Sequence, residues 1–153
     1  MSLEKAKQYL EKKGYLDRVI EPEVSTATVE LAAAAIGVEP GRICKSLSFL
    51  LDDRAILILA EGMARVDNRK YKDTFGKKAK MIPRDMVEQY IGHEAGGVCP
   101  FGVNEEVEIY LDESLRQWDE VYPAAGNAHS AVRLRLEELE ELVNAKGWVD
   151  VCK

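Results

Sequence analysis

The chain has 153 residues, of which 46% are hydrophobic and 31% are charged, and its formal net charge is −6 at pH 7. These values are typical of a water-soluble globular chain with a real core, and the length predicts a single domain over residues 1–153. They exclude a membrane-spanning helix, because no apolar run approaches the roughly 20 residues that such a helix needs.

The histidines and cysteines are few and scattered. The cysteines are Cys44, Cys99 and Cys152, an odd number without any C-x-x-C pair, which argues against a disulfide framework. His93 and His129 are the only histidines, and they do not stand at the spacing of a zinc site. We therefore expect no metal. The first residues also lack the order of a signal peptide, so we expect a cytoplasmic protein.

In the first half of the chain, helical and strand patterns alternate irregularly. Apolar residues recur at helical spacing over Leu3–Lys13 and Val29–Ile36, and Thr28 is placed to cap the second helix. Two apolar runs, Ser46–Leu51 and Ala55–Glu61, flank a short polar turn and predict a β-hairpin.

The second half has shorter elements. Helices are predicted over Asn68–Thr74, Arg84–Tyr90 and Leu136–Val143, and residues 91–105 hold too many glycines and prolines for a helix or a central strand. The predicted strands are short and apolar: Lys80–Ile82, Glu106–Leu111, Glu120–Tyr122, Ala131–Leu134 and Trp148–Val151. This order predicts an α+β fold, with a mixed, strongly curved, barrel-like sheet and flanking helices.

Two features of this order point to chemistry. Lys45 stands at the start of an apolar strand, where we expect its ammonium to face the glycine-rich loop from Gly96 to Gly102. A lysine opposite exposed backbone N–H groups suits a phosphate or an ester carbonyl, although a lone lysine at a strand edge is more often simply solvated. Gly97 and Pro100 belong to the same loop, whose glycines allow a close approach of backbone to ligand.

Cys99 lies within this loop and raises a second hypothesis. A thiolate nucleophile needs a base within hydrogen-bonding reach, and His93 is six residues away. The sequence therefore leaves open a small hydrolase that uses Cys99 and His93. Nothing in the chain resembles paired glycosidase carboxylates, a P-loop or a Rossmann turn.

Lys45, the glycine loop and the segment Ala125-Gly126-Asn127 together resemble the YbaK/EbsC family over roughly residues 24–143. The family consists of aminoacyl-tRNA deacylase domains related to the editing insert of bacterial prolyl-tRNA synthetases. The resemblance implies trans-acting hydrolysis of mischarged aminoacyl-tRNA, with tRNA for proline carrying a small wrong amino acid as the substrate. It implies no cofactor, a tRNA acceptor end and prolyl-tRNA synthetase as partners, and no DNA or membrane.

The resemblance also assigns roles to residues. Lys45, Gly96 and Gly97 are carried over as the catalytic set, and the predicted substrate-binding residues are Thr28, Val98, Cys99, Pro100, Gly126 and Asn127. Two positions set this chain apart: the YbaK subgroup has an acidic residue where Ala131 stands, and His129 is close to a histidine of the synthetase-type relatives without being shown equivalent.

Charge is distributed unevenly. Residues 65–84 hold eight basic and two acidic residues, a net +6, which leaves −12 on the remainder of the chain. Such a stretch can dock a phosphate backbone, but it can equally be a solvated surface. The alternative to an enzyme is a binding module for tRNA or a synthetase that lacks efficient turnover. Oligomeric state is not encoded in any of these features, and a monomer is the default expectation.

Overall fold

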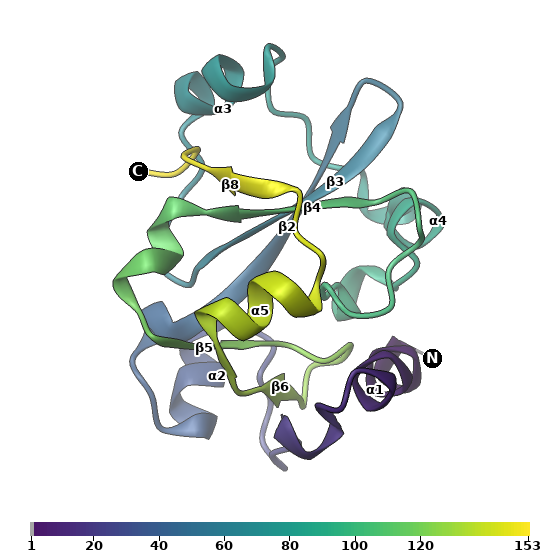
Figure 1. The fold of residues 1–153 in the computed structure, drawn as a ribbon, viewed down its shortest axis with the longest axis vertical. Coiled ribbons are helices and arrows are strands. Elements are labelled where there is room, and N and C mark those ends of the chain that lie inside the picture. Colours follow the sequence, from purple (N-terminus) through teal and green to yellow (C-terminus); the bar gives the residue numbers. More distant parts are fainter. Residues whose placement is uncertain (1) are drawn as a thin grey trace.

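The computed structural model describes residues 2–153 as a curved mixed sheet with helices on both faces (Figure 1). The helices are α1 (Ser2–Lys12), α2 (Val29–Ile36), α3 (Asn68–Phe75), α4 (Val87–Ile91) and α5 (Leu136–Leu142). The strands are β1 (Val19–Ile20), β2 (Ile43–Leu51), β3 (Arg54–Glu61), β4 (Glu108–Asp112), β5 (Glu120–Pro123), β6 (Ala131–Val132), β7 (Leu134–Arg135) and β8 (Gly147–Val149). Single turns of 3₁₀-helix are η1 (Leu16–Arg18), η2 (Pro40–Arg42), η3 (Arg84–Met86), η4 (Ala95–Gly97) and η5 (Glu113–Gln117).

The main sheet has the strand order β7-β5-β2-β3-β4-β8, and β1 and β6 form a separate pair. β2 and β3 are antiparallel, whereas β2–β5, β3–β4 and β4–β8 are parallel. The sheet is thus mixed, as the irregular order of elements predicts, and the α+β fold with flanking helices is confirmed.

Alternation along β2 separates two layers. Ile43 and Phe49 share one face of the strand, where they pack in clusters with residues of α2 and α3. Cys44 points to the opposite face and joins the largest core cluster, which also contains residues of α1, α4 and α5. Since Lys45 lies between Ile43 and Phe49 in this alternation, its side chain leaves the sheet on the α2/α3 side.

Local sequence explains the ends of the elements that build the site. The Thr28 hydroxyl accepts a hydrogen bond from the Leu31 N–H at 3.1 Å, and α2 ends where Gly37 adopts φ = 84°, a conformation that favours glycine. Asp67 caps α3 through the N–H groups of Arg69 and Lys70. Helices α2 and α3 therefore begin and end almost where the capping residues predict.

Several predicted elements differ in detail. The predicted strand Lys80–Ile82 is only an isolated bridge between Met81 and Phe49, and the predicted helix Arg84–Tyr90 is split into η3 and α4. The predicted strand Ala131–Leu134 is two short strands, because Arg133 N donates to the carbonyl of Arg18 between them. No helix within residues 2–153 is both long and apolar enough to cross a membrane.

Candidate functional site

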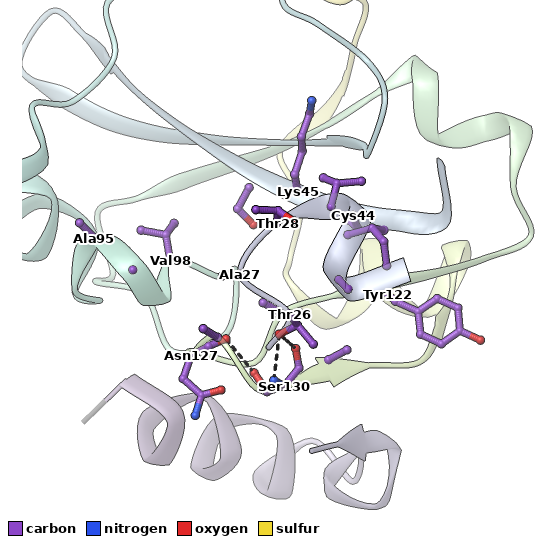
Figure 2. Close-up of a pocket in the computed structure, with 18 residues that line it drawn as sticks. Thr26, Ala27, Thr28, Cys44, Lys45, Ala95, Val98, Tyr122, Asn127 and Ser130 are labelled. Carbon is purple, nitrogen blue, oxygen red and sulfur yellow. Dashed lines mark hydrogen bonds between the residues drawn. The ribbon is translucent and has the colours of Figure 1, made fainter. Parts of the chain in front are cut away.

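A cavity of about 220 Å³ opens between α2, the edge of β2 and two loops, residues 95–98 and 124–131 (Figure 2). Most of its lining side chains are small: seven alanines, serines and threonines stand among them in the order Thr26, Ala27, Thr28, Ala32, Ser46, Ala124 and Ala128. Lys45 is the only charged residue that lines it within the described part of the chain. The cavity is therefore small, weakly polar and provided with a single cation.

The cavity exists because β2 lacks a strand neighbour at this point. β5 pairs with β2 only at Ile43 and Cys44, and farther along the strand Ile82 N donates to the carbonyl of Ser48. Neither neighbour reaches Ser46, which lines the cavity. A sheet edge left open in this way offers backbone groups to a ligand.

Hydroxyl groups hold one wall in place. The Thr26 N–H donates to the carbonyl of Ala128 at 2.6 Å, and the Thr26 hydroxyl accepts from the Ser130 N–H at 3.2 Å. Ser130 is 1% exposed, and its hydroxyl accepts from the Ala125 N–H at 3.0 Å and donates to the carbonyl of Asn127 at 3.2 Å. These bonds, drawn in part in Figure 2, tie the segment before α2 to the 124–131 loop.

Asn127 lines the cavity, and its side-chain oxygen accepts from the His129 N–H at 2.9 Å. The imidazole of His129 is directed elsewhere: it is exposed, lies 3.2 Å from the carbonyl of Val24, and is not part of the lining. His129 therefore shapes the loop through its backbone and offers no imidazole to the cavity.

The glycine loop contributes through its backbone. Gly96 and Val98 line the cavity, and the N–H groups of both face no hydrogen-bond acceptor within residues 2–153. Gly97 lies behind them, where a Cβ would approach the carbonyl oxygen of Gly126 to 2.3 Å. The two loops thus touch backbone to backbone, and only a residue without a side chain fits at Gly97.

Cys99 and His93 lie close together, but they are fully buried behind the cavity. The Cys99 sulfur is 3.6 Å from His93 Nε2, and that same nitrogen lies 2.6 Å from the carbonyl of Phe101, which requires it to carry a proton. Nε2 therefore cannot accept the thiol proton. Burial raises the pKa of Cys99 to about 12 and lowers that of His93, so the pair stays neutral at pH 7. This geometry argues against the Cys99–His93 hydrolase.

Lys45 is the third residue of β2, and its ammonium donates to the carbonyls of Gly62, at 3.3 Å, and Ala64. In Figure 2 its side chain extends away from Ala95 and Val98. The expectation that the ammonium faces the glycine loop is wrong for this conformation, because strand alternation turns the side chain to the other side. The residue still lines the cavity, and its flexible stem places the ammonium at the cavity's rim.

The structure thus brings together five of the nine predicted site residues: Lys45, Gly96, Thr28, Val98 and Asn127 line the cavity. The other four do not: Gly97, Cys99, Pro100 and Gly126 form the packed layer behind it. Sequence reasoning missed Ser46, Tyr122 and Ser130, which line the cavity as well. The signal for Ser46 was its position directly after Lys45. Within residues 2–153 no group of His, Cys, Asp or Glu is arranged to hold a metal ion.

The sequence matches the family model of the aminoacyl-tRNA editing domain over residues 23–142. The chain belongs to this family. It is 47% identical to the uncharacterized protein YwhH of Bacillus subtilis, over all of this chain and 98% of that protein. It is also 31% identical to the proline–tRNA ligase of the same organism over 66% of this chain, but it spans only 18% of the ligase.

Solved structures agree with this assignment. A crystal structure of a protein assigned as a candidate trans-editing enzyme for prolyl-tRNA synthetase superposes with a TM-score of 0.89, at 33% identity over 99% of this chain and 97% of that one. The hypothetical protein APE2540 superposes with a TM-score of 0.85, at 25% identity over 97% and 99% of the two chains. The resemblance to YbaK-type editing domains is therefore confirmed, and the chain is an editing domain related to that of prolyl-tRNA synthetase.

Proposed function

We propose that this editing domain acts in trans, in the cytoplasm, and hydrolyses the ester between a small, wrongly attached amino acid and the 3′ end of tRNA for proline. The observation that carries the proposal is the cavity itself. It joins unpaired N–H groups of Gly96 and Val98 to walls of alanine and a single cation. A large or charged aminoacyl side chain finds neither space nor a counter-ion there, so the expected amino acids are alanine, serine and cysteine.

The residues of the lining limit the chemistry. No carboxylate or imidazole lines the cavity, and burial raises the pKa of the lining Cys44 thiol to about 12. A side-chain general base is therefore absent from the lining, and an attacking water depends on polarisation of the ester carbonyl. The N–H groups of Gly96 and Val98 are suited to receive the negative charge that develops on the carbonyl oxygen.

In the proposed reaction a water oxygen bonds to the carbonyl carbon, the bond from that carbon to the ribose oxygen breaks, and the water's proton ends on the ribose oxygen. The vicinal ribose hydroxyl of the substrate is the nearest group able to relay this proton. An ester is already activated, so orientation and oxyanion stabilisation suffice. Lys45 would leave the carbonyls of Gly62 and Ala64 to bind the phosphate of the terminal nucleotide.

The test is a panel of tRNA for proline charged with alanine, serine, cysteine or proline, incubated with the unmodified chain, the Lys45→Ala variant and a Lys12→Ala control on exposed α1. We expect hydrolysis of one or more of the small amino acids but not of proline. Loss of the ammonium should lower kcat/KM by about 10²-fold or more, as removal of a transition-state donor does elsewhere. The Lys12→Ala variant should keep full activity.

Stability must be followed alongside, because the Lys45 ammonium bonds two carbonyls and its loss should cost about 1–2 kcal/mol. A Lys45→Ala variant that is folded and fully active would refute the role of Lys45. Absence of hydrolysis for the whole panel, with bound tRNA retained, would instead identify a binding module. Whether prolyl-tRNA synthetase must accompany the chain is tested by adding the synthetase to the same assay.

A further inference from the structure

The surface around α3 carries cations without partners. Eight basic residues occupy 65–84, and only two of them form ion pairs: Lys70 with Asp150 at 3.1 Å and Lys77 with Asp52 at 3.4 Å. The remaining six are all exposed and form no ion pair or hydrogen bond through their side chains with any residue of 2–153: Arg65, Arg69, Lys72, Lys78, Lys80 and Arg84. Lys77, which the sequence alone singles out with Lys78, is therefore partly neutralised.

Three of the unpaired cations converge. Arg69, Lys72 and Lys78 line a cleft of about 470 Å³ together with Asn68 and Ala79, and no acidic side chain belongs to its lining. Like charges three positions apart on a helix, as in Arg69 and Lys72, repel one another and contribute nothing to folding. A cleft of one charge sign concentrates its field on an anionic ligand. These cations are thus better explained by a ligand than by stability.

The cleft lies on the same side of the sheet as the ammonium of Lys45. The ring of Tyr71 in α3 packs 5.1 Å from that of Phe49, and Phe49 shares its face of β2 with Lys45, four residues or about 13 Å away. Arg65 directly follows Ala64, whose carbonyl receives the Lys45 ammonium, and so places a further exposed cation between the cavity and α3. Positive charge is therefore continuous from the cavity rim to the cleft, although α2 and α3 lie at different ends of the molecule (Figure 1).

We propose that the Arg69–Lys72–Lys78 cleft binds the sugar–phosphate backbone of the tRNA whose 3′ end occupies the cavity. This inference rests on the proposed function. Backbone contact is favoured over base contact because Tyr71, the aromatic residue of α3 next to these cations, is fully buried and offers no surface for stacking. The remainder of the chain carries −12, so it repels RNA and restricts docking to this strip.

The experiment measures the affinity of uncharged tRNA for proline at several salt concentrations, by fluorescence anisotropy. The variant is Lys72→Glu/Lys78→Glu, and the matched control is Lys12→Glu/Lys13→Glu, which changes the net charge equally on α1 and the residue after it. Each lost phosphate contact should reduce the log–log salt slope by roughly 0.7–0.9. The variant should therefore lose about 1.6 units of slope, which is roughly 40-fold in affinity at 0.1 M salt if the curves meet near 1 M. The control should keep both values.

Hydrolysis of an aminoacyl-adenosine by the same proteins separates this inference from the proposed function. We expect all of them to hydrolyse this minimal substrate equally, because the cleft does not line the cavity. An unchanged salt slope in the variant overturns the cleft as an RNA site, even if hydrolysis proceeds, and leaves it to another acidic ligand. A failure of the unmodified chain on every aminoacyl substrate refutes the proposed function instead. If the Glu variant unfolds, Lys72→Gln/Lys78→Gln must show the same loss of slope.

Discussion

Replacing Gly97 with alanine should separate the two loops that frame the cavity. The added Cβ would lie 2.3 Å from the carbonyl oxygen of Gly126, 3.0 Å from its carbonyl carbon and 3.2 Å from the Cβ of Ser2. The first two of these atoms are backbone, so they cannot rotate away, and relief requires one loop to shift. Alanine at this position therefore acts on the cavity although its side chain does not line it.

The cost can be estimated from overpacking. Forcing one methyl group into a packed site costs about 1–3 kcal/mol, so Gly97→Ala should lower the free energy of unfolding by about 2 kcal/mol. For a chain of this length that corresponds to a fall in Tm of roughly 4–8 °C. The displaced loop should also lower kcat for the aminoacyl ester, because the Val98 N–H moves with it.

Gly96 provides the matched control. A Cβ built at Gly96 meets no atom within 4 Å, and its backbone does not have positive φ. Gly96→Ala should therefore change the free energy of unfolding by less than about 0.5 kcal/mol. Urea unfolding of both variants, followed by circular dichroism, measures the difference. The packing argument is refuted if Gly97→Ala is as stable as the unmodified chain, or if the two alanine variants lose stability equally.

The remaining predictions concern single side chains. Hydrogen bonds from Arg18, at 3.0 Å to each carboxylate oxygen, hold the pKa of Glu138 at about 2, against an ordinary 4.5. Glu138→Gln should therefore cost about 2 kcal/mol at pH 7, and the difference should vanish as pH falls from 4.5 toward 2, whereas exposed Glu137→Gln should show neither effect in the same urea titrations. Tyr71→Phe should leave stability unchanged or raise it by up to about 1 kcal/mol, because the buried hydroxyl has no partner among residues 2–153; a clear loss in urea unfolding would reveal one. Cys99→Ser should retain most of the deacylase activity in the charged-tRNA assay, since the hydroxyl can still donate to the carbonyl of Phe101, and complete loss in a folded variant would revive the thiol hypothesis.

The sequence by itself determined the helices and the class of fold. Thr28 and Gly37 set both ends of α2, which spans Val29–Ile36 as predicted, since capping and left-handed glycine are local effects. Asp52 and Asp53 similarly predicted the β2–β3 hairpin, where Asp52 adopts φ = 58°. Strand limits were less accurate: β2 begins at Ile43 rather than Ser46, because pairing with Tyr122 and Pro123 extends it.

The site was determined only in part by the sequence. The motifs at Lys45, Gly96 and Asn127 named three of the segments that meet, but spacing along the chain does not say which way each side chain points. Tertiary structure decided that Gly97 and Gly126 pack against each other and that the Lys45 ammonium rests on the carbonyls of Gly62 and Ala64. The physical reason is that strand alternation, an unpaired sheet edge and backbone contact between loops arise from pairing partners far apart in the sequence, whereas caps and turns arise from neighbours.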